Sequence, residues 1–211
     1  MNLTDGESAI LEHIDLYGLT TVTAVARILC DGDRRSATAE LETLVRRRAL
    51  FRFDKVYTRT STPPKARDRW RDFATLSYCC LGNHLRPRIA KHRLEAALEG
   101  PAKTLGVRPP AGKACIFDRD DHLARIWVEP FSRTADGMPL GKMLALLQRT
   151  TRGRAFQLWA YLALSGEFSM LVLCRSRARA DELGRWLQRA PLVGEAGPES
   201  IEIPVKTAAI Q

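Results

Sequence analysis

Apolar residues recur at helical spacing near the start of the chain. Ile10 and Ile14 lie four positions apart within an apolar-rich segment, as in a helix with one buried face. Thr4 and Glu7 precede them at the spacing of a capping box, in which each residue binds a free amide of the other. Gly18 follows and supplies the left-handed residue on which many helices end. The pattern predicts a first helix between Thr4 and Gly18.

Two more helices are predicted before residue 50. Thr21 offers a cap for the apolar segment 22–29, and the Asp-Gly-Asp sequence at 31–33 is typical of a turn. Residues 34–48 place their apolar side chains on one stripe and leave arginines and hydroxyl groups on the other face. We expect helix, turn and helix in this order.

A β-hairpin is predicted directly after the third helix. The runs 50–53 and 56–60 are rich in aromatic and β-branched residues, and only Asp54 and Lys55 separate them, the length of a tight hairpin turn. Three short helices followed by a basic hairpin predict a winged helix-turn-helix domain over residues 1–64.

The rest of the chain is predicted to be linking helices over residues 65–105 and a mixed α/β domain with a small sheet over residues 106–211. The linking helices also offer a surface for pairing two chains. The individual elements expected are helices over 66–81 and 87–98, strands over 114–117 and 123–128, a helix over 138–150, a strand over 170–174, a helix over 179–189 and a strand over 201–205. The fold class is therefore expected to be α+β.

The composition is that of a folded protein without membrane segments. Hydrophobic residues make up 45% and charged residues 27% of the chain, as in ordinary globular proteins. No apolar run approaches the roughly 18 residues that a helical span requires. The first eight residues carry acids where a secretory signal has basic and apolar regions. We expect a cytoplasmic protein that does not enter the membrane.

Cysteine and histidine give no sign of a metal or cofactor site. Five cysteines form neither a paired disulfide pattern nor a zinc-ligand pattern. Most of them resemble small buried apolar residues, although a reactive or metal-binding thiol stays open. The four histidines are scattered, and no phosphate-binding or dinucleotide-binding glycine motif is present. We assign no metal and no cofactor.

The positive charge is concentrated in one segment. The formal net charge is +9, and the segment from Arg34 to Arg71 holds twelve basic and four acidic residues, so the remaining chain taken together is close to neutral. Such a segment favours a polyanionic partner, and without an amphipathic anchor it favours nucleic acid over a membrane surface. A solvated basic face is the other interpretation.

The third helix is expected to enter the major groove of double-stranded DNA, with the hairpin placed against the backbone. The candidate DNA-contacting residues are Thr21, Thr23, Arg34, Arg35, Ser36, Thr38, Arg46, Arg47, Arg52, Lys55 and Arg59. Two alternatives stay open. The arginines that end the third helix also offset the helix macrodipole, and a winged helix can bind protein instead of DNA.

A second hypothesis concerns the carboxylates Asp118 and Glu129. Each follows a predicted strand, and such a pair can hold a Mg²⁺ ion in a DNA nuclease or nickase. Nucleases of this kind usually have a lysine two positions after the glutamate, where this chain has Phe131. We therefore expect no catalytic residues, and keep the metal-dependent nuclease as the alternative.

The order of elements resembles the replication-relaxation family of plasmid and mobile-element proteins. The resemblance rests on the helical span 10–48 with its hairpin, the helices around 76–98, the strand ends Ile116-Phe117-Asp118 and Ile126-Trp127-Val128-Glu129, and the helix through Lys142 and Leu147. It implies a winged helix joined to a degenerate domain similar to restriction endonucleases. Pro130 and Phe131 depart from an active site of that kind, so dimerisation or interaction is the role expected of the C-terminal half.

The leading expectation is a sequence-preferring protein that binds double-stranded DNA as a homodimer. One winged helix covers only a half-site, and symmetrical pairing extends the contact. The resemblance implies a regulator of transcription, replication or transfer of a mobile element. The alternatives are the nuclease and a protein-interaction adaptor.

Overall fold

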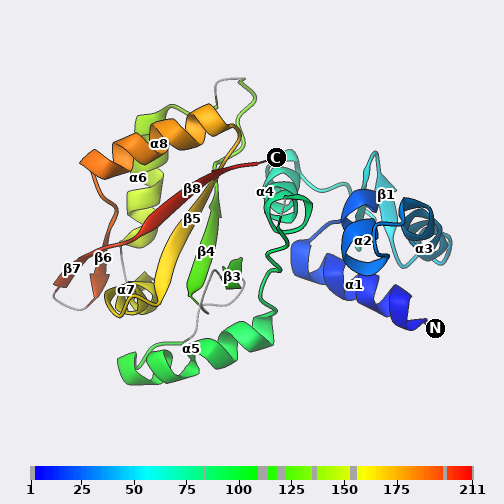
Figure 1. The fold of residues 1–211 in the computed structure, drawn as a ribbon, viewed down its shortest axis with the longest axis horizontal. Coiled ribbons are helices and arrows are strands. Elements are labelled where there is room, and N and C mark those ends of the chain that lie inside the picture. The colour runs from blue at the N-terminus through cyan, green and yellow to red at the C-terminus, as the bar shows by residue number, and fades with distance from the viewer. Residues whose placement is uncertain are drawn as a thin grey trace. The chain divides into compact units, whose positions relative to one another are not determined.

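The computed structural model describes residues 3–82, 84–108, 114–117, 122–134, 137–152, 156–196 and 199–210. These residues form an α+β fold with two compact units (Figure 1). The first unit is Met1–Leu85 and the second is Arg86–Ile210. The region 65–105, expected to link two domains, is thus divided between the units, with its first helix in one and its second helix in the other.

The first unit contains the three helices and the hairpin in the predicted order. Its elements are α1 (Asp5–Tyr17), α2 (Val22–Leu29), α3 (Arg34–Arg46), β1 (Phe51–Phe53), β2 (Val56–Thr58), α4 (Ala66–Leu76) and a π-helical turn η1 (Ser77–Leu81). A shared apolar core joins α1, α2 and α3 through Ile10, Ile14, Val25, Leu41 and Leu44, each at most 1% exposed. Burial of this common stripe stabilises three helices that are too short to be stable alone.

The predicted capping box at the start of α1 is confirmed. The Glu7 amide donates to Thr4 Oγ1 at 3.1 Å, and the Thr4 amide donates to Glu7 Oε2 at 2.9 Å. Gly18 ends the helix with φ of 83°. A Cβ atom at Gly18 would lie 2.7 Å from Asp72 Oδ2. The left-handed backbone favours glycine there, and a larger residue would also have to displace the Asp72 carboxylate.

The hairpin is attached to the segment between α1 and α2. Strands β1 and β2 are antiparallel, with Phe51 opposite Thr58. Thr20 forms an isolated bridge with Tyr57, and both backbone hydrogen bonds between them measure 2.9 Å. The Thr20 hydroxyl also lies 3.1 Å from Nε2 of the buried His13. The hairpin therefore has a fixed position beside the helices of its unit.

The second unit is built around a four-stranded sheet of order β3-β4-β5-β8 (Figure 1). Its elements are α5 (Lys91–Leu105), β3 (Cys115–Phe117), β4 (Leu123–Val128), α6 (Leu140–Thr151), α7 (Gln157–Leu164), β5 (Phe168–Cys174), α8 (Arg177–Arg189), β6 (Val193–Ala196), β7 (Glu199–Glu202) and β8 (Val205–Ala209). Strand β3 is antiparallel to β4, whereas β4, β5 and β8 are parallel. Strands β6 and β7 form a separate antiparallel pair.

The strand predicted over 170–174 is β5, an inner strand of this sheet that is buried on both faces. All seven residues of β5 are buried. On one face Phe168, Met170 and Val172 join an apolar core that includes Trp159 of α7 and Leu183 of α8. Continuous burial explains why β5 lacks the alternation of polar and apolar residues seen in half-exposed strands.

Several predicted boundaries were wrong. The helix expected over 87–98 is α5, which continues through Pro101 because Leu98 and Ala102 on either side of it are both buried in the core. The strand expected over 201–205 is interrupted, since β7 ends at Glu202 and β8 begins at Val205. The third helix ends at Arg46, because Arg48 adopts a left-handed backbone with φ of 58°.

The sequence pattern also missed α7. This helix is apolar on nearly all sides, with Leu158, Trp159, Ala160, Leu162 and Ala163 buried, so it has no polar stripe that would reveal its period. All five cysteines are free thiols, and four of them are buried as expected. Within the described ranges, no helix combines the length and the apolar character needed to cross a membrane.

Candidate nucleic-acid interface

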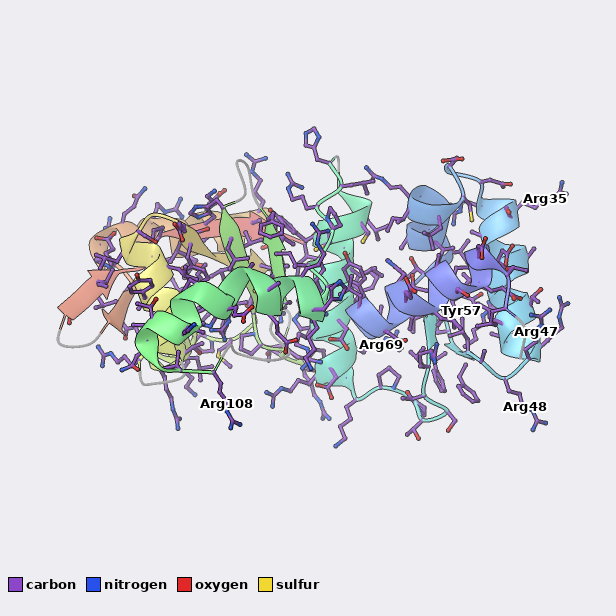
Figure 2. The ribbon with its side chains drawn as sticks, turned by 90° about the horizontal axis from the view of Figure 1, so that it is seen from below. Arg35, Arg47, Arg48, Tyr57, Arg69 and Arg108 are labelled. Atoms are coloured by element: carbon purple, nitrogen blue, oxygen red, sulfur yellow. The ribbon has the colours of Figure 1, made fainter. Side chains whose placement is uncertain are left out.

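The N-terminal end of α3 presents several of the predicted DNA-contacting side chains to solvent. Arg34, Arg35, Ser36 and Thr38 are all exposed. The carboxylate of Asp33 caps the helix by accepting the Arg35 amide at 2.8 Å. Within the part of the chain that the structure describes, neither Arg34 nor Arg35 forms an ion pair. Figure 2 shows the Arg35 side chain extending away from the helix.

The exposed face of α3 continues along its whole length. Arg35, Glu42 and Arg46 are separated by seven and then four positions, so they share one face of the helix. The opposite face is buried through Ala37, Leu41 and Leu44. Arg35 and Glu42 are therefore about 10 Å apart along the helix axis.

Glu42 joins the hairpin to this face of α3. Its Oε1 atom accepts hydrogen bonds from Arg52 Nη1 at 3.0 Å and from the Tyr57 hydroxyl at 2.9 Å. Burial raises the pKa of Tyr57, and the hydrogen bond to Glu42 raises it further. The phenol consequently stays protonated and donates. The structure thus brings the hairpin and α3 together, as the sequence prediction required.

Arg52 is occupied by contacts within the first unit. Besides its ion pair with Glu42, its Nε donates to the Asp54 carbonyl at 3.1 Å, and its guanidinium lies 5.8 Å from the centre of the Tyr57 ring. The Arg52 side chain is still 55% exposed. Its main contacts hold the hairpin turn in place, whereas the neighbouring Lys55 is exposed and has no ion pair with a described residue.

Arg47 has a structural partner that the sequence did not reveal. Its Nη1 donates to both carboxylate oxygens of Glu7, each at 2.8 Å. The Glu7 side chain is only 3% exposed, whereas that of Arg47 is 42% exposed. A carboxylate buried to this extent requires a counter-charge, so Arg47 joins the end of α3 to the start of α1.

The remaining candidate residues of the first unit have varied surroundings. Arg46 donates to the Thr43 hydroxyl at 2.9 Å, and Arg59 lies 3.7 Å from Asp15 in an exposed ion pair. The Thr21 hydroxyl caps α2 by accepting the Ala24 amide at 3.2 Å, and Thr23 is exposed. Thr21 therefore has a local role that serves the helix whether or not DNA is present.

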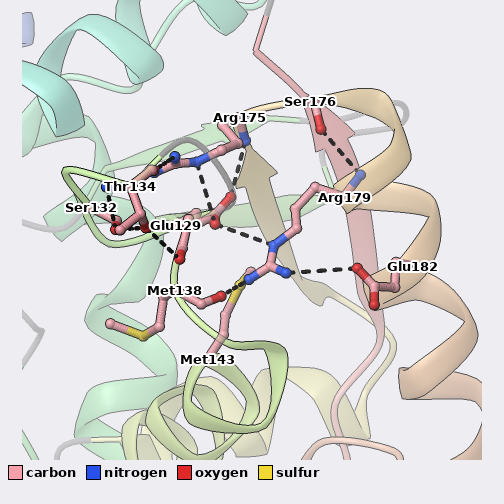
Figure 3. A network of polar contacts seen from close by, with 10 residues as sticks. Glu129, Ser132, Thr134, Met138, Met143, Arg175, Ser176, Arg179 and Glu182 are labelled. Carbon is pink, nitrogen blue, oxygen red and sulfur yellow. Dashed lines mark hydrogen bonds and ion pairs between the residues drawn. The ribbon is translucent and has the colours of Figure 1, made fainter.

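The candidate catalytic residue Glu129 lies in the second unit, directly after β4 (Figure 3). It is fully buried. Its carboxylate accepts the Arg175 amide at 3.1 Å and Arg179 Nε at 3.3 Å, and Arg175 Nε is 3.6 Å away. Arg175 follows the adjacent parallel strand β5, and Arg179 belongs to the first turn of α8. Two guanidinium groups therefore compensate one buried carboxylate.

Further contacts hold these two arginines in place. Arg175 Nη1 donates to the Thr134 carbonyl at 2.9 Å, and Arg179 Nη2 donates to the Met138 carbonyl (Figure 3). Gly137 adopts φ of 76°, and a Cβ atom there would lie 2.7 Å from Glu129 Oε1. The loop after β4 needs this glycine so that the buried ion pairs can form.

These contacts give Glu129 a role different from the one that a nuclease requires. A catalytic metal ligand needs an accessible carboxylate, and this carboxylate is bound by arginines. Its proposed partner Asp118 lies outside the described residues. Among those that are described, no group of three or more histidine, cysteine or acidic side chains is placed to hold a metal ion. Glu129 acts as a buried counter-ion that fixes α8 against β4 and β5.

The chain outside residues 34–71 is near neutral only as a sum. Residues 1–33 contain six acidic and one basic residue, which offset most of the basic excess of 34–71. Residues 86–211 contain 20 basic and 13 acidic residues, so the near-neutral remainder hid two segments of opposite sign. The second unit carries a larger net positive charge than the first. Both units therefore have an excess of basic residues.

Comparison of the chain with models of protein families, with curated proteins and with solved structures gives no match.

Proposed function

We propose that this chain binds double-stranded DNA through the first unit, in which α1 to α3 and the hairpin β1–β2 act as a winged helix. One observation carries the proposal. Arg34 and Arg35 extend from the start of α3 without an ion pair to any described residue, while the same face of α3 is joined through Glu42 to a basic hairpin. A helix and a β-ribbon arranged in this way match the major groove and the adjacent backbone.

The proposed contacts divide into two classes. Arg35 is proposed to read a base edge, since a guanidinium can donate two hydrogen bonds to the O6 and N7 atoms of guanine. Arg34, Lys55 and Thr23 are exposed and are proposed to contact phosphates, which gives affinity without sequence information. Arg47 and Arg52 are proposed to orient α3 and the hairpin through their carboxylate partners.

We further propose that two copies of the chain bind one site. A single winged helix covers a half-site, and a two-fold pair doubles the contacts made with a palindromic sequence. Regulation of replication, transfer or transcription, as implied by the resemblance to the replication-relaxation family, is part of this proposal. Sedimentation of the chain with and without a duplex gives the stoichiometry directly.

Selection of bound duplexes from a random pool, followed by anisotropy titrations of the full chain, tests this proposal. Arg35→Lys retains the charge but loses the two-pronged donor, so it should lower the ratio of specific to non-specific affinity by about tenfold while non-specific affinity stays similar. Lys55→Ala should reduce the salt slope by about 0.9 per bound chain. Arg93→Ala, which removes an exposed charge from α5, is the matched control.

Two results would reject the proposal. The first is the absence of any salt-dependent binding to duplex DNA. The second is an equal loss of duplex affinity in Lys55→Ala and Arg93→Ala, which would mean that net charge alone drives binding. If charge reversal at Arg34 and Arg35 abolished capture of a protein partner and left DNA binding intact, the adaptor hypothesis would replace this one.

A further inference from the structure

The C-terminal half of α8 carries an exposed tryptophan between two exposed arginines. Trp186 is 48% exposed, and Arg185 and Arg189 are exposed beside it. Among the phenylalanine, tyrosine and tryptophan side chains that the structure describes, only Trp186 and Phe131 belong to the exposed class. We call Arg185, Trp186 and Arg189 the α8 surface.

The three side chains of the α8 surface lie close together on one side of a long, well-anchored helix. Arg189 follows Arg185 by four positions and Trp186 by three, which are the spacings of neighbouring side chains on a helix. The other side of α8 is buried through Ala180 and Leu183. The indole is therefore held outward by the packing of its helix, and its ring remains available to a partner.

The two arginines of the α8 surface form no ion pair with a described residue. Arg179 of the same helix, in contrast, pairs with Glu182 and with Glu129. The sequence of the second unit has an excess of basic residues overall. A partner with regularly spaced negative charges fits such a surface.

We propose that the α8 surface binds single-stranded nucleic acid, with a base stacked on the Trp186 indole and the phosphates beside it contacted by Arg185 and Arg189. Proteins that bind single strands combine aromatic stacking platforms with basic side chains in this way. The bases of duplex DNA are stacked and offer no free face to an indole on a helix surface. A single strand can therefore contact Trp186 and both arginines, whereas a duplex can contact only the two arginines.

A second copy of the chain is a poorer occupant of the same surface. A two-fold interface places the same patch of both copies against itself, which would bring Arg185 and Arg189 of one copy close to those of the other. Like charges brought together in a desolvated interface repel each other strongly. The arginine charges that favour a polyanion thus disfavour pairing of two copies through α8.

Anisotropy of a fluorescein-labelled oligothymidine of about 16 nucleotides, the upper end of known site sizes, tests the proposal on the full chain. Trp186→Ala should weaken binding by at least fivefold, and Trp186→Phe, which retains an aromatic face, should restore most of it. The double variant Arg185→Ala/Arg189→Ala should reduce the salt slope by about 1.4, since each phosphate contact with a single strand contributes about 0.7.

The matched control is the double variant Arg93→Ala/Lys103→Ala, which removes two exposed charges from α5. It should change the affinity for oligothymidine less than the α8 double variant does. Adding Trp186→Ala to this control should still weaken oligothymidine binding. Unchanged oligothymidine binding in Trp186→Ala, or an equal loss in the control, would overturn the proposal. Loss of duplex binding alone in the α8 variants would overturn the single-strand assignment.

This inference does not rest on the proposed function of the first unit. Arg35→Ala is expected to weaken duplex binding and to leave oligothymidine binding unchanged, whereas Trp186→Ala is expected to do the reverse. If duplex binding fails for every variant while the Trp186 effect remains, the α8 surface stands and the winged-helix proposal falls.

Discussion

Substitution of Arg47 tests whether this arginine stabilises the fold or contacts DNA. Its guanidinium donates to both oxygens of Glu7 at 2.8 Å, and the Glu7 side chain is 3% exposed. Replacing Arg47 with alanine leaves that carboxylate buried, and among the described residues the Thr4 amide, at 2.9 Å, remains as its hydrogen-bond donor. We therefore expect Arg47→Ala to destabilise the first unit.

The expected loss lies between two limits. Removal of one member of a fully buried ion pair costs about 3–5 kcal/mol, and removal of a surface pair costs about 0–1 kcal/mol. Because Arg47 is 42% exposed while Glu7 is 3% exposed, the value should be about 2 kcal/mol. With a urea dependence typical of a domain of this size, the midpoint of unfolding should fall by about 1–2 M.

Fluorine NMR of the chain labelled with 5-fluorotryptophan measures each unit separately. Trp70 is the one tryptophan of the first unit, and the other three belong to the second. Urea titration should show the Trp70 transition shifting in Arg47→Ala, while the transitions of the second unit stay in place. Arg34→Ala, which removes an exposed arginine without an ion pair to a described residue, should shift neither.

A double-mutant cycle identifies the partner. In a Glu7→Gln background the buried charge is gone, so Arg47→Ala should cost at least 1 kcal/mol less than it does in the native background. An unchanged Trp70 midpoint in Arg47→Ala, together with a loss of duplex affinity as large as that of Arg35→Ala, would refute the assignment of Arg47 as a structural residue.

Three further predictions follow from burial and backbone geometry. Burial lowers the pKa of His13 from 6.5 to about 4, so the unfolded chain binds the proton first as the pH falls. The free energy of unfolding should therefore drop by roughly 3 kcal/mol between pH 6.5 and 4. Urea titrations at several pH values should show that His13→Gln removes this dependence. Gly137→Ala should lower the stability of the second unit by more than about 2 kcal/mol in calorimetry, because it combines a left-handed backbone with a Cβ atom 2.7 Å from Glu129 Oε1. The control Gly166→Ala, at φ of 74° with nothing within 4 Å of its Cβ atom, should cost only about 1 kcal/mol. Equal losses in the two variants would contradict the steric argument. Cys30 is the one cysteine that is not buried, so about one thiol per folded chain should react with Ellman's reagent, and none should do so rapidly in Cys30→Ser.

Local signals made the first unit predictable from sequence. The capping box of Thr4 and Glu7, the glycine at position 18 and the two-residue turn at Asp54 act within a few residues, and each produced the expected element. The helix α7 had no such signal, because burial on nearly all sides removes the polar stripe from which a helical period is recognised.

Ion pairing was the part of the candidate site that sequence could not reveal. The basic segment 34–71 was recognised by its charge, yet the partner of Arg47 lies 40 positions away at Glu7. Glu129 was recognised as an acid at a strand end, but its partners Arg175 and Arg179 come from the next parallel strand and helix. The number of charged residues can be counted in the sequence. Which acidic side chain pairs with which arginine depends on tertiary contacts between distant residues, and no short sequence pattern predicts it.

The parallel sheet has a consequence for the order in which the chain acquires its structure. Leu123 at the start of β4 pairs with Phe168 of β5, 45 positions later, and Met170 pairs with Val205. Pairings that close such long loops form slowly. During synthesis the first unit can fold, and β3 can pair with β4, while the edge of β4 that pairs with β5 is still free. An unpaired edge of this kind recruits other chains. Aggregation therefore competes with folding while the second unit is being synthesised.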